Sequence, residues 1–119
     1  KLPSGRVLSY WGARLEAGSI VFMGQNQTTR KWEKTETWGG KLVENIVQAY
    51  ARDCLAVALL RLDKAGYQTA FHVHDEIVVE APEDSHWEDM AEIMSRPIDW
   101  APGLLLKADG YATDFYMKD

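Results

Sequence analysis

The clearest hydrophobic pattern in the chain is helical. From residue 41 to about residue 64, apolar side chains recur every three or four positions, which predicts one long amphipathic helix that ends near Gly66. A second, shorter helix is expected over about 86–94, where Asp84 or Ser85 is placed to act as the N-cap. We therefore expect one long and one short helix.

Apolar runs bounded by turn residues predict the strands. We expect a hairpin over 69–82, while the polar residues 25–36 indicate a loop or an exposed ribbon. Further strands are expected at 7–11, at 19–23 and at 104–108, the last continued past a bulge at Gly110 through 111–116. This order favours an α+β fold, with the long and the short helix packed on one face of an antiparallel sheet.

Composition narrows the class of protein. The chain has 119 residues, 46% hydrophobic and 26% charged, which favours a single globular domain over 1–119 and argues against disorder. Within it, 16–40 is expected to be an exposed hairpin or loop insertion. No apolar run is long enough to span a membrane, so we expect no membrane partner. The single cysteine, Cys54, is expected to be buried filler and fits a reducing cytosol.

The charge argues against a free-standing nucleic-acid-binding domain. The formal net charge is −5, whereas such a domain normally carries a basic surface that neutralises phosphates. If the chain contacts DNA, other protein must supply much of the positive field. The sequence also begins with Lys1 instead of Met, from which we expect a piece of a longer protein.

The candidate chemistry lies in residues 71–80. Asp75 and Glu76 are adjacent acids between apolar, strand-forming residues, and an unpaired carboxylate inside a strand is costly unless something compensates its charge. A divalent cation would compensate it, and a bend at the acids would let them face a cleft. An ordinary solvated turn is the other interpretation, because Asp is favoured in turns. The decapeptide alone leaves both open.

A third interpretation uses the histidines of the same segment. His72, His74 and Glu76 alternate, so an unbroken strand would place all three on one face. Such a set suits the zinc or iron site of a small metal-dependent hydrolase. It requires a strand that continues through Glu76, and it leaves Asp75 on the other face. Spacing does not decide between these interpretations.

A polar row accompanies the long helix. Lys41, Asn45, Gln48 and Arg52 are separated by four, three and four positions, which aligns them on one side of the helix. A solvated helix face is the simple interpretation. The alternative is a row of hydrogen-bonding groups for an extended ligand, because a Gln amide both donates and accepts, as reading a nucleic-acid groove requires.

Three landmarks occur in order along the chain: residues 2–6 with Tyr10, the helix segment 48–53, and the tetrapeptide 73–76. Together they resemble the C-terminal part of family A DNA polymerases, the bacterial polymerase I type. They are similar to the Gly-Arg turn and strand after the fingers, to the glutamine helix, and to motif C of the palm. The phrase 39–48 resembles members from phages and prophages. The resemblance covers essentially the whole chain and strengthens the α+β expectation.

The resemblance implies a function for each candidate residue at the hairpin. Asp75 would be one of two aspartates that hold paired Mg²⁺ ions during template-directed nucleotidyl transfer in DNA replication, with Glu76 as a supporting ligand. His74 would lie near the primer terminus, and Gln48 would contact the minor groove. The implied partners are a DNA primer–template, a dNTP and the rest of the polymerase.

Further DNA contacts would come from Lys41, Asn45 and Arg52.

One position departs from the pattern of the family. Four residues before the glutamine the family usually has Asn, and here Glu44 stands in that place. Phosphates would repel a carboxylate that faces DNA, so we expect Glu44 to point elsewhere.

Other parts of the family's machinery are missing from this sequence. The second metal-binding aspartate lies in an Asp-x-Ser-Gln-Ile-Glu segment, motif A, which does not occur here, and neither do the fingers helix and the thumb. We therefore expect that this chain alone does not polymerise. The alternatives are a stand-alone metal-dependent hydrolase built on His72, His74 and Glu76, or a non-catalytic nucleic-acid-binding remnant.

Overall fold

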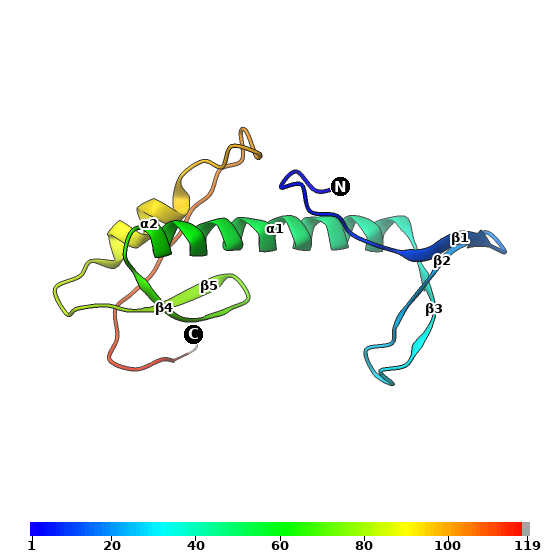
Figure 1. Ribbon diagram of the computed structural model, residues 1–119, viewed down its shortest axis with the longest axis horizontal. Coiled ribbons are helices and arrows are strands. Elements are labelled where there is room, and N and C mark those ends of the chain that lie inside the picture. The colour runs from blue at the N-terminus through cyan, green and yellow to red at the C-terminus, as the bar shows by residue number, and fades with distance from the viewer. Residues whose placement is uncertain (118–119) are drawn as a thin grey trace. The chain divides into compact units, whose positions relative to one another are not determined.

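Two helices and five strands make up the regular structure of residues 1–117. A computed structural model describes residues 1–117. In chain order the elements are β1 (Trp11–Glu16), β2 (Ser19–Gln25), β3 (Trp32–Thr37), α1 (Gly39–Lys64), β4 (Gln68–Val73), β5 (Glu76–Glu80) and α2 (Trp87–Ser95) (Figure 1). The α+β class is confirmed. The strands of residues 1–117 are antiparallel, as expected, and they divide into a three-stranded and a two-stranded sheet.

The chain divides into two compact parts. We call Lys1–Tyr50 the N-terminal part and Ala51–Asp119 the C-terminal part, and α1 runs through the boundary. That the chain is one domain therefore stays a prediction. No helix within residues 1–117 combines the length and the apolarity that crossing a bilayer requires.

In the N-terminal part, β2 is the middle strand of a three-stranded sheet. Residue Leu15 of β1 lies opposite Ile20, which in turn lies opposite Thr37 of β3. The middle strand also supplies the buried side chain of Val21. Most of the segment 16–40 is thus a hairpin of β2, β3 and the turn that joins them, and its being an insertion stays a prediction.

The first ten residues of the N-terminal part contact the beginning of α1 through side chains. The Arg6 guanidinium donates a hydrogen bond to the carbonyl oxygen of Ala49 over 3.3 Å. The Tyr10 hydroxyl accepts one from the Asn45 amide over 3.1 Å, and its ring meets Phe22 edge to face at 5.1 Å. The strand predicted at 7–11 is wrong, because this segment bonds the helix and strand pairing begins only at Trp11.

The helix α1 confirms the predicted long helix and has a defined end. Gly66 adopts a left-handed φ of 92°, which glycine tolerates because it has no Cβ. Its N–H bonds to the carbonyl of Asp63, and the N–H of Tyr67 bonds to the carbonyl of Leu62, each over 3.0 Å. This pair of bonds is a Schellman motif, which satisfies carbonyls that the last turn leaves without partners.

The core of the C-terminal part lies along the second half of α1. Leu55, Ala58 and Leu62 are buried there, and Leu62 has no exposed surface. The Arg61 guanidinium on the same helix donates to the carbonyl oxygens of Arg96 and Pro97 over 2.8 and 2.7 Å. Arg61 therefore links α1 to the C-terminal end of α2, where carbonyl oxygens without intrahelical partners attract a cation.

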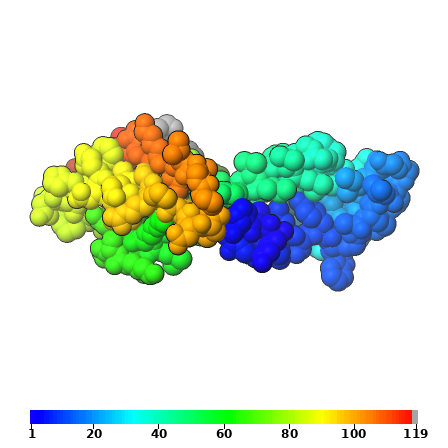
Figure 2. All heavy atoms as spheres, turned by 90° about the horizontal axis from the view of Figure 1, so that it is seen from above, coloured from blue at the N-terminus to red at the C-terminus, as the bar shows by residue number. Residues whose placement is uncertain are grey.

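The end of the C-terminal part differs from the sequence prediction. His86 occupies the N-cap position of α2 without a side-chain hydrogen bond, so the predicted cap at Asp84 or Ser85 is wrong. No strand forms between residue 104 and residue 117. Instead, the Ala108 N–H donates to the Ser95 hydroxyl over 3.1 Å, which places this segment beside α2 (Figure 2, orange beside yellow). Several of its large apolar side chains are exposed, including those of Leu105 and Phe115.

Candidate functional site

The acidic tip of the hairpin is formed by a two-residue loop. Strand β4 ends at Val73, β5 begins at Glu76, and these two residues face each other. The loop residues are His74 and Asp75, and only His74 has a positive φ, of 53°. A positive φ at the first loop position alone is the pattern of a type II′ turn, which fits the right-handed twist of the flanking strands. The predicted hairpin with its acids at the bend is confirmed.

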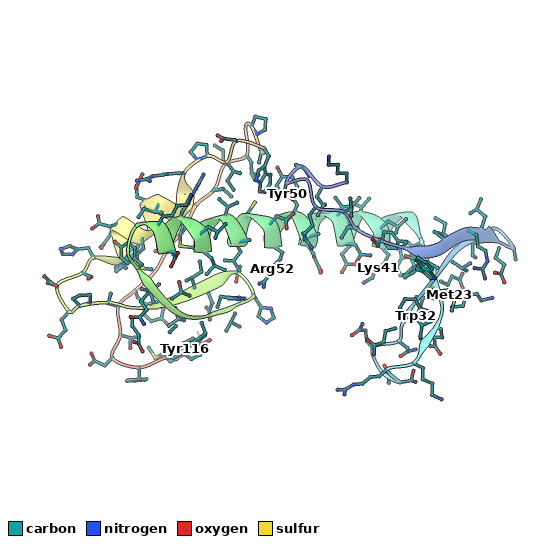
Figure 3. The ribbon with its side chains drawn as sticks, in the orientation of Figure 1. Met23, Trp32, Lys41, Tyr50, Arg52 and Tyr116 are labelled. Carbon is teal, nitrogen blue, oxygen red and sulfur yellow. The ribbon has the colours of Figure 1, made fainter. Side chains whose placement is uncertain are left out.

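The hairpin presents different residues on its two faces. Directly opposed residues of an antiparallel pair share a face, so His72 lies with Ile77 and Val73 lies with Glu76. His72 and Glu76 are therefore on opposite faces. On the face that carries His72, the side chain of Arg52 from α1 lies with its Nη1 3.4 Å from His72 Nδ1. The other side is covered by the chain end that carries Tyr116 (Figure 3).

This geometry overturns the zinc hypothesis. The hypothesis requires one unbroken strand through Glu76, whereas a loop interrupts the strand at His74 and Asp75. Because of that loop, His72 and Glu76 occupy different faces and cannot converge on one ion. Within residues 1–117, no three side chains drawn from His, Cys, Asp and Glu come together in a way that could hold a metal ion.

The Asp75 carboxylate is accessible. The residue is exposed, and within the described part of the chain its side chain takes part in no hydrogen bond or ion pair. An exposed carboxylate without a protein partner can bind a hard cation such as Mg²⁺, which prefers oxygen ligands and keeps several waters. Within residues 1–117 one neighbouring carboxylate lies at the tip, that of Glu76, and no group of three possible metal ligands forms there.

Glu76 has a partner that the sequence analysis missed. The Tyr116 hydroxyl donates a hydrogen bond to Glu76 Oε1 over 2.8 Å, and this bond raises the pKa of the Tyr116 hydroxyl. The Tyr116 ring also meets Phe71 edge to face at 5.0 Å. The two residues of the hydrogen bond are forty positions apart, and the apolar pattern around Tyr116 predicted a strand, so no local signal indicated the contact.

In the N-terminal part, the polar row on α1 is joined by an acid. Lys41 Nζ lies 3.3 Å from Glu44 Oε2, and the Gln48 amide donates to Glu44 Oε1 over 3.2 Å. The Glu44 side chain thus lies among the polar row, and whether it points away from DNA stays a prediction. Its spacings of three and four residues place it beside both side chains on the helix surface.

The remaining members of the row bond to other elements. Asn45 is half-buried, and its amide donates to Tyr10, so this donor is used inside the N-terminal part. In the C-terminal part, Arg52 is exposed and faces His72. The sequence placed these residues on α1 correctly, but the partners of Asn45 and Arg52 come from distant segments.

The thiol of Cys54 is not among the predicted site residues. Burial raises the pKa of the Cys54 thiol, and the neighbouring Asp53 raises it further, which makes the thiol less reactive.

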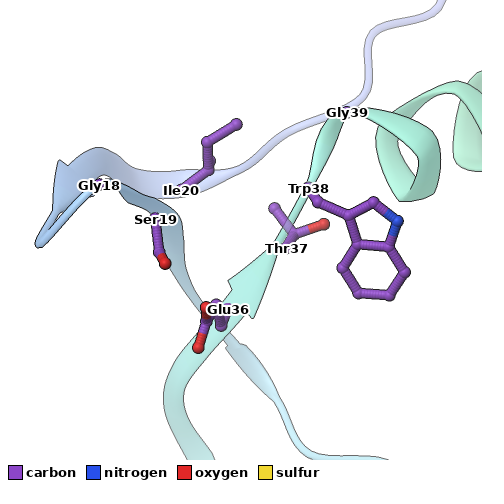
Figure 4. Close-up of a pocket in the computed structure, with 7 residues that line it drawn as sticks. All are labelled: Gly18, Ser19, Ile20, Glu36, Thr37, Trp38 and Gly39. Atoms are coloured by element: carbon purple, nitrogen blue, oxygen red, sulfur yellow. The ribbon is translucent and has the colours of Figure 1, made fainter.

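Figure 4 shows a pocket in the N-terminal part lined by Gly18, Ser19, Ile20, Glu36, Thr37, Trp38 and Gly39. Within residues 1–117, the buried hydroxyl of Thr37 in this pocket has no hydrogen-bond partner.

Comparison with known proteins gives one informative match. Over its whole length the chain is similar to a region of the DNA polymerase of Bacillus phage SP02, with 51% identity over 126 aligned positions. The chain spans only 19% of the length of that polymerase. No family model matches the chain, and no solved structure matches it.

The aligned region includes every candidate residue, because the similarity covers the whole chain. A chain of 119 residues that aligns with about a fifth of a DNA polymerase is similar to a segment of that enzyme rather than to all of it.

Proposed function

We propose that this chain is the C-terminal palm segment of a family A DNA polymerase of the phage or prophage type, which acts in the bacterial cytoplasm. The observation that carries the proposal is the exposed, unpaired Asp75 at the tip of a tight hairpin. The 51% identity to a region of a phage DNA polymerase supports the same class of enzyme. DNA, dNTP and the rest of the polymerase are the proposed partners.

The donor set at the tip fits magnesium. Asp75 and Glu76 offer only oxygen atoms, which Mg²⁺ prefers, and no cationic side chain within residues 1–117 is bonded to Asp75. Asp75 would hold the metal directly, and Glu76 would support it. When bound, a pair of such ions stabilises the attacking and leaving oxygens of an in-line nucleotidyl transfer. The second aspartate would come from outside this chain.

The loop and the helix row would position the DNA. His74 is exposed in the same two-residue loop as Asp75, which suits a group that contacts the primer terminus. Gln48 is exposed on α1, and its amide could exchange the bond to Glu44 for an acceptor in the minor groove. Lys41 lies against Glu44, so its charge offsets the carboxylate that would otherwise repel phosphate.

The hairpin acids alone do not make a polymerase. Two-metal transfer requires a second set of ligands and a clamp for the triphosphate, and residues 1–117 contain no cluster of three side chains that could ligate a metal ion. We therefore expect the 119-residue chain to incorporate no nucleotide by itself, and the parent polymerase to be the active form.

The test is Asp75→Ala in the parent polymerase. We expect kcat for nucleotide incorporation to fall by about 10³-fold or more, as when other central catalytic groups are removed, while the Kd for primer–template DNA changes little. The matched control is Asp84→Ala, because Asp84 is also an exposed aspartate in a turn. Retained synthesis by the Asp75 variant would refute the proposed function.

A further inference from the structure

The C-terminal segment that crosses the hairpin forms its own small set of bonds. We call residues 111–117 the strap. Within it, the Tyr111 hydroxyl donates to the carbonyl oxygen of Met117 over 2.9 Å, and the Thr113 hydroxyl donates to the carbonyl oxygen of Phe115 over 3.0 Å. Both bonds end on backbone carbonyls of the strap itself, which contains no helix or strand.

One side chain of the strap contacts the acidic tip. Tyr116 uses its ring against Phe71 of β4 and its hydroxyl on Glu76 of β5, so it bridges both strands of the hairpin on one face. The ring contact fixes where the hydroxyl lies, since an edge-to-face aromatic pair adds specific geometry to the burial of apolar area. The hydroxyl then fixes Glu76 Oε1, because a hydrogen bond to a charged acceptor is stronger than a neutral one.

We propose that Tyr116 is a positioning residue for the metal-binding tip, and that it acts through Glu76. This inference rests on the proposed function. With Oε1 held by the hydroxyl, Glu76 presents Oε2 in a fixed direction to a divalent cation or to one of its waters. Groups that orient the carboxylates around a metal typically contribute about 10–100-fold to metal affinity.

The hydrogen bond from Tyr116 also restricts the side-chain conformation of Glu76. Asp75 lies in the loop, whereas Glu76 begins β5 on the face of Val73. Without the Tyr116 hydroxyl, the exposed Glu76 side chain would sample several rotamers, and each metal-binding event would have to order it again. Tyr116 removes this cost before the cation arrives.

The test compares two tyrosines of the strap in the parent polymerase. Tyr116→Phe removes the hydroxyl on Glu76 and keeps the ring on Phe71, while Tyr111→Phe removes a hydroxyl that bonds only the Met117 backbone. The readout is Mn²⁺ affinity of the polymerase–DNA complex, measured by electron paramagnetic resonance. We expect about tenfold weaker binding for Tyr116→Phe, at the low end of such orienting contributions, and no change for Tyr111→Phe.

A double variant decides whether Tyr116 acts through Glu76. In the Glu76→Ala background, adding Tyr116→Phe should weaken Mn²⁺ binding no further, because the partner of the hydroxyl is already gone. Unchanged or tighter Mn²⁺ binding by Tyr116→Phe overturns the inference, and so does a full effect that persists in the Glu76→Ala background.

Two further measurements keep the inference separate from the proposed function and from folding. If Asp75→Ala does not weaken Mn²⁺ binding, the proposed function itself fails; if it does and Tyr116→Phe does not, only the inference fails. Tyr116 is 45% exposed, so its hydroxyl should be dispensable for folding. A crystal structure of the unmodified polymerase with Mn²⁺ gives an independent check, since a Tyr116 hydroxyl beyond hydrogen-bond distance of Glu76 would also overturn the inference.

Discussion

The two halves of α1 have the same hydrophobic spacing but opposite burial. In the first half, Val43, Ile46 and Val47 are 58%, 47% and 61% exposed. In the second half, Leu55, Ala58 and Leu62 are 8%, 6% and 0% exposed. The helix is continuous from Gly39 to Lys64, so secondary structure does not cause the difference. Burial depends on whether another element covers the apolar side, and the structure leaves these three side chains of the first half largely uncovered.

The difference indicates where each half contributes. The second half of α1 belongs to the core of the C-terminal part, and its Arg52 lies beside His72 of the hairpin. The first half carries the exposed polar row around Glu44 together with uncovered apolar side chains. Under the proposed function, the first half would be covered by DNA and by the rest of the polymerase.

The largest expected effect in this comparison is that of Leu62→Ala. Leu62 is fully buried, so truncation leaves a cavity and should lower the free energy of unfolding by about 2–5 kcal/mol. Val47→Ala at an exposed position of the same helix should change it by less than about 0.5 kcal/mol. Urea denaturation of both variants of the 119-residue chain measures the two values. Equal losses would show that the two halves are covered alike in solution.

Glycine-to-alanine substitutions at the two ends of α1 should have the next largest effects on stability, and these effects should have opposite signs. Gly66→Ala forces a Cβ into a left-handed φ of 92° and should destabilise the chain by about 1–2 kcal/mol. Gly39→Ala meets no atom within 4 Å and should stabilise the chain by about 0.5–1 kcal/mol, because Ala has less backbone freedom to lose. Thermal unfolding reports both signs. A stabilising Gly66→Ala would contradict the Schellman motif at the end of α1.

The smallest effect concerns the link between the first ten residues and α1. Tyr10→Phe removes the hydroxyl that accepts the Asn45 amide bond and keeps the ring contact with Phe22. We expect a loss of about 0.5–1.5 kcal/mol in the free energy of unfolding. In the Asn45→Ala background the same change should cost close to nothing, since the donor is absent. A full loss in that background would show that the hydroxyl stabilises the chain by another contact.

The sequence by itself determined the elements whose signals are local. The long helix follows from apolar side chains three and four positions apart, and the hairpin follows from two adjacent apolar runs around Asp75. In both, each residue contacts close neighbours in the chain, so spacing contains the information. Asp75 and Glu76 could be placed at the bend for the same reason, since they are adjacent in the chain, whereas metal binding by them stays a prediction.

Only the tertiary structure decided which surfaces are covered and which distant residues meet. The strand expected over 104–116 is absent because a strand needs a partner, and the apolar pattern of a segment does not provide one. The same segment instead brings Tyr116 to Glu76, forty positions away in the chain. Periodicity shows which side of a helix or segment is apolar, but whether that side is buried depends on elements that are remote in sequence.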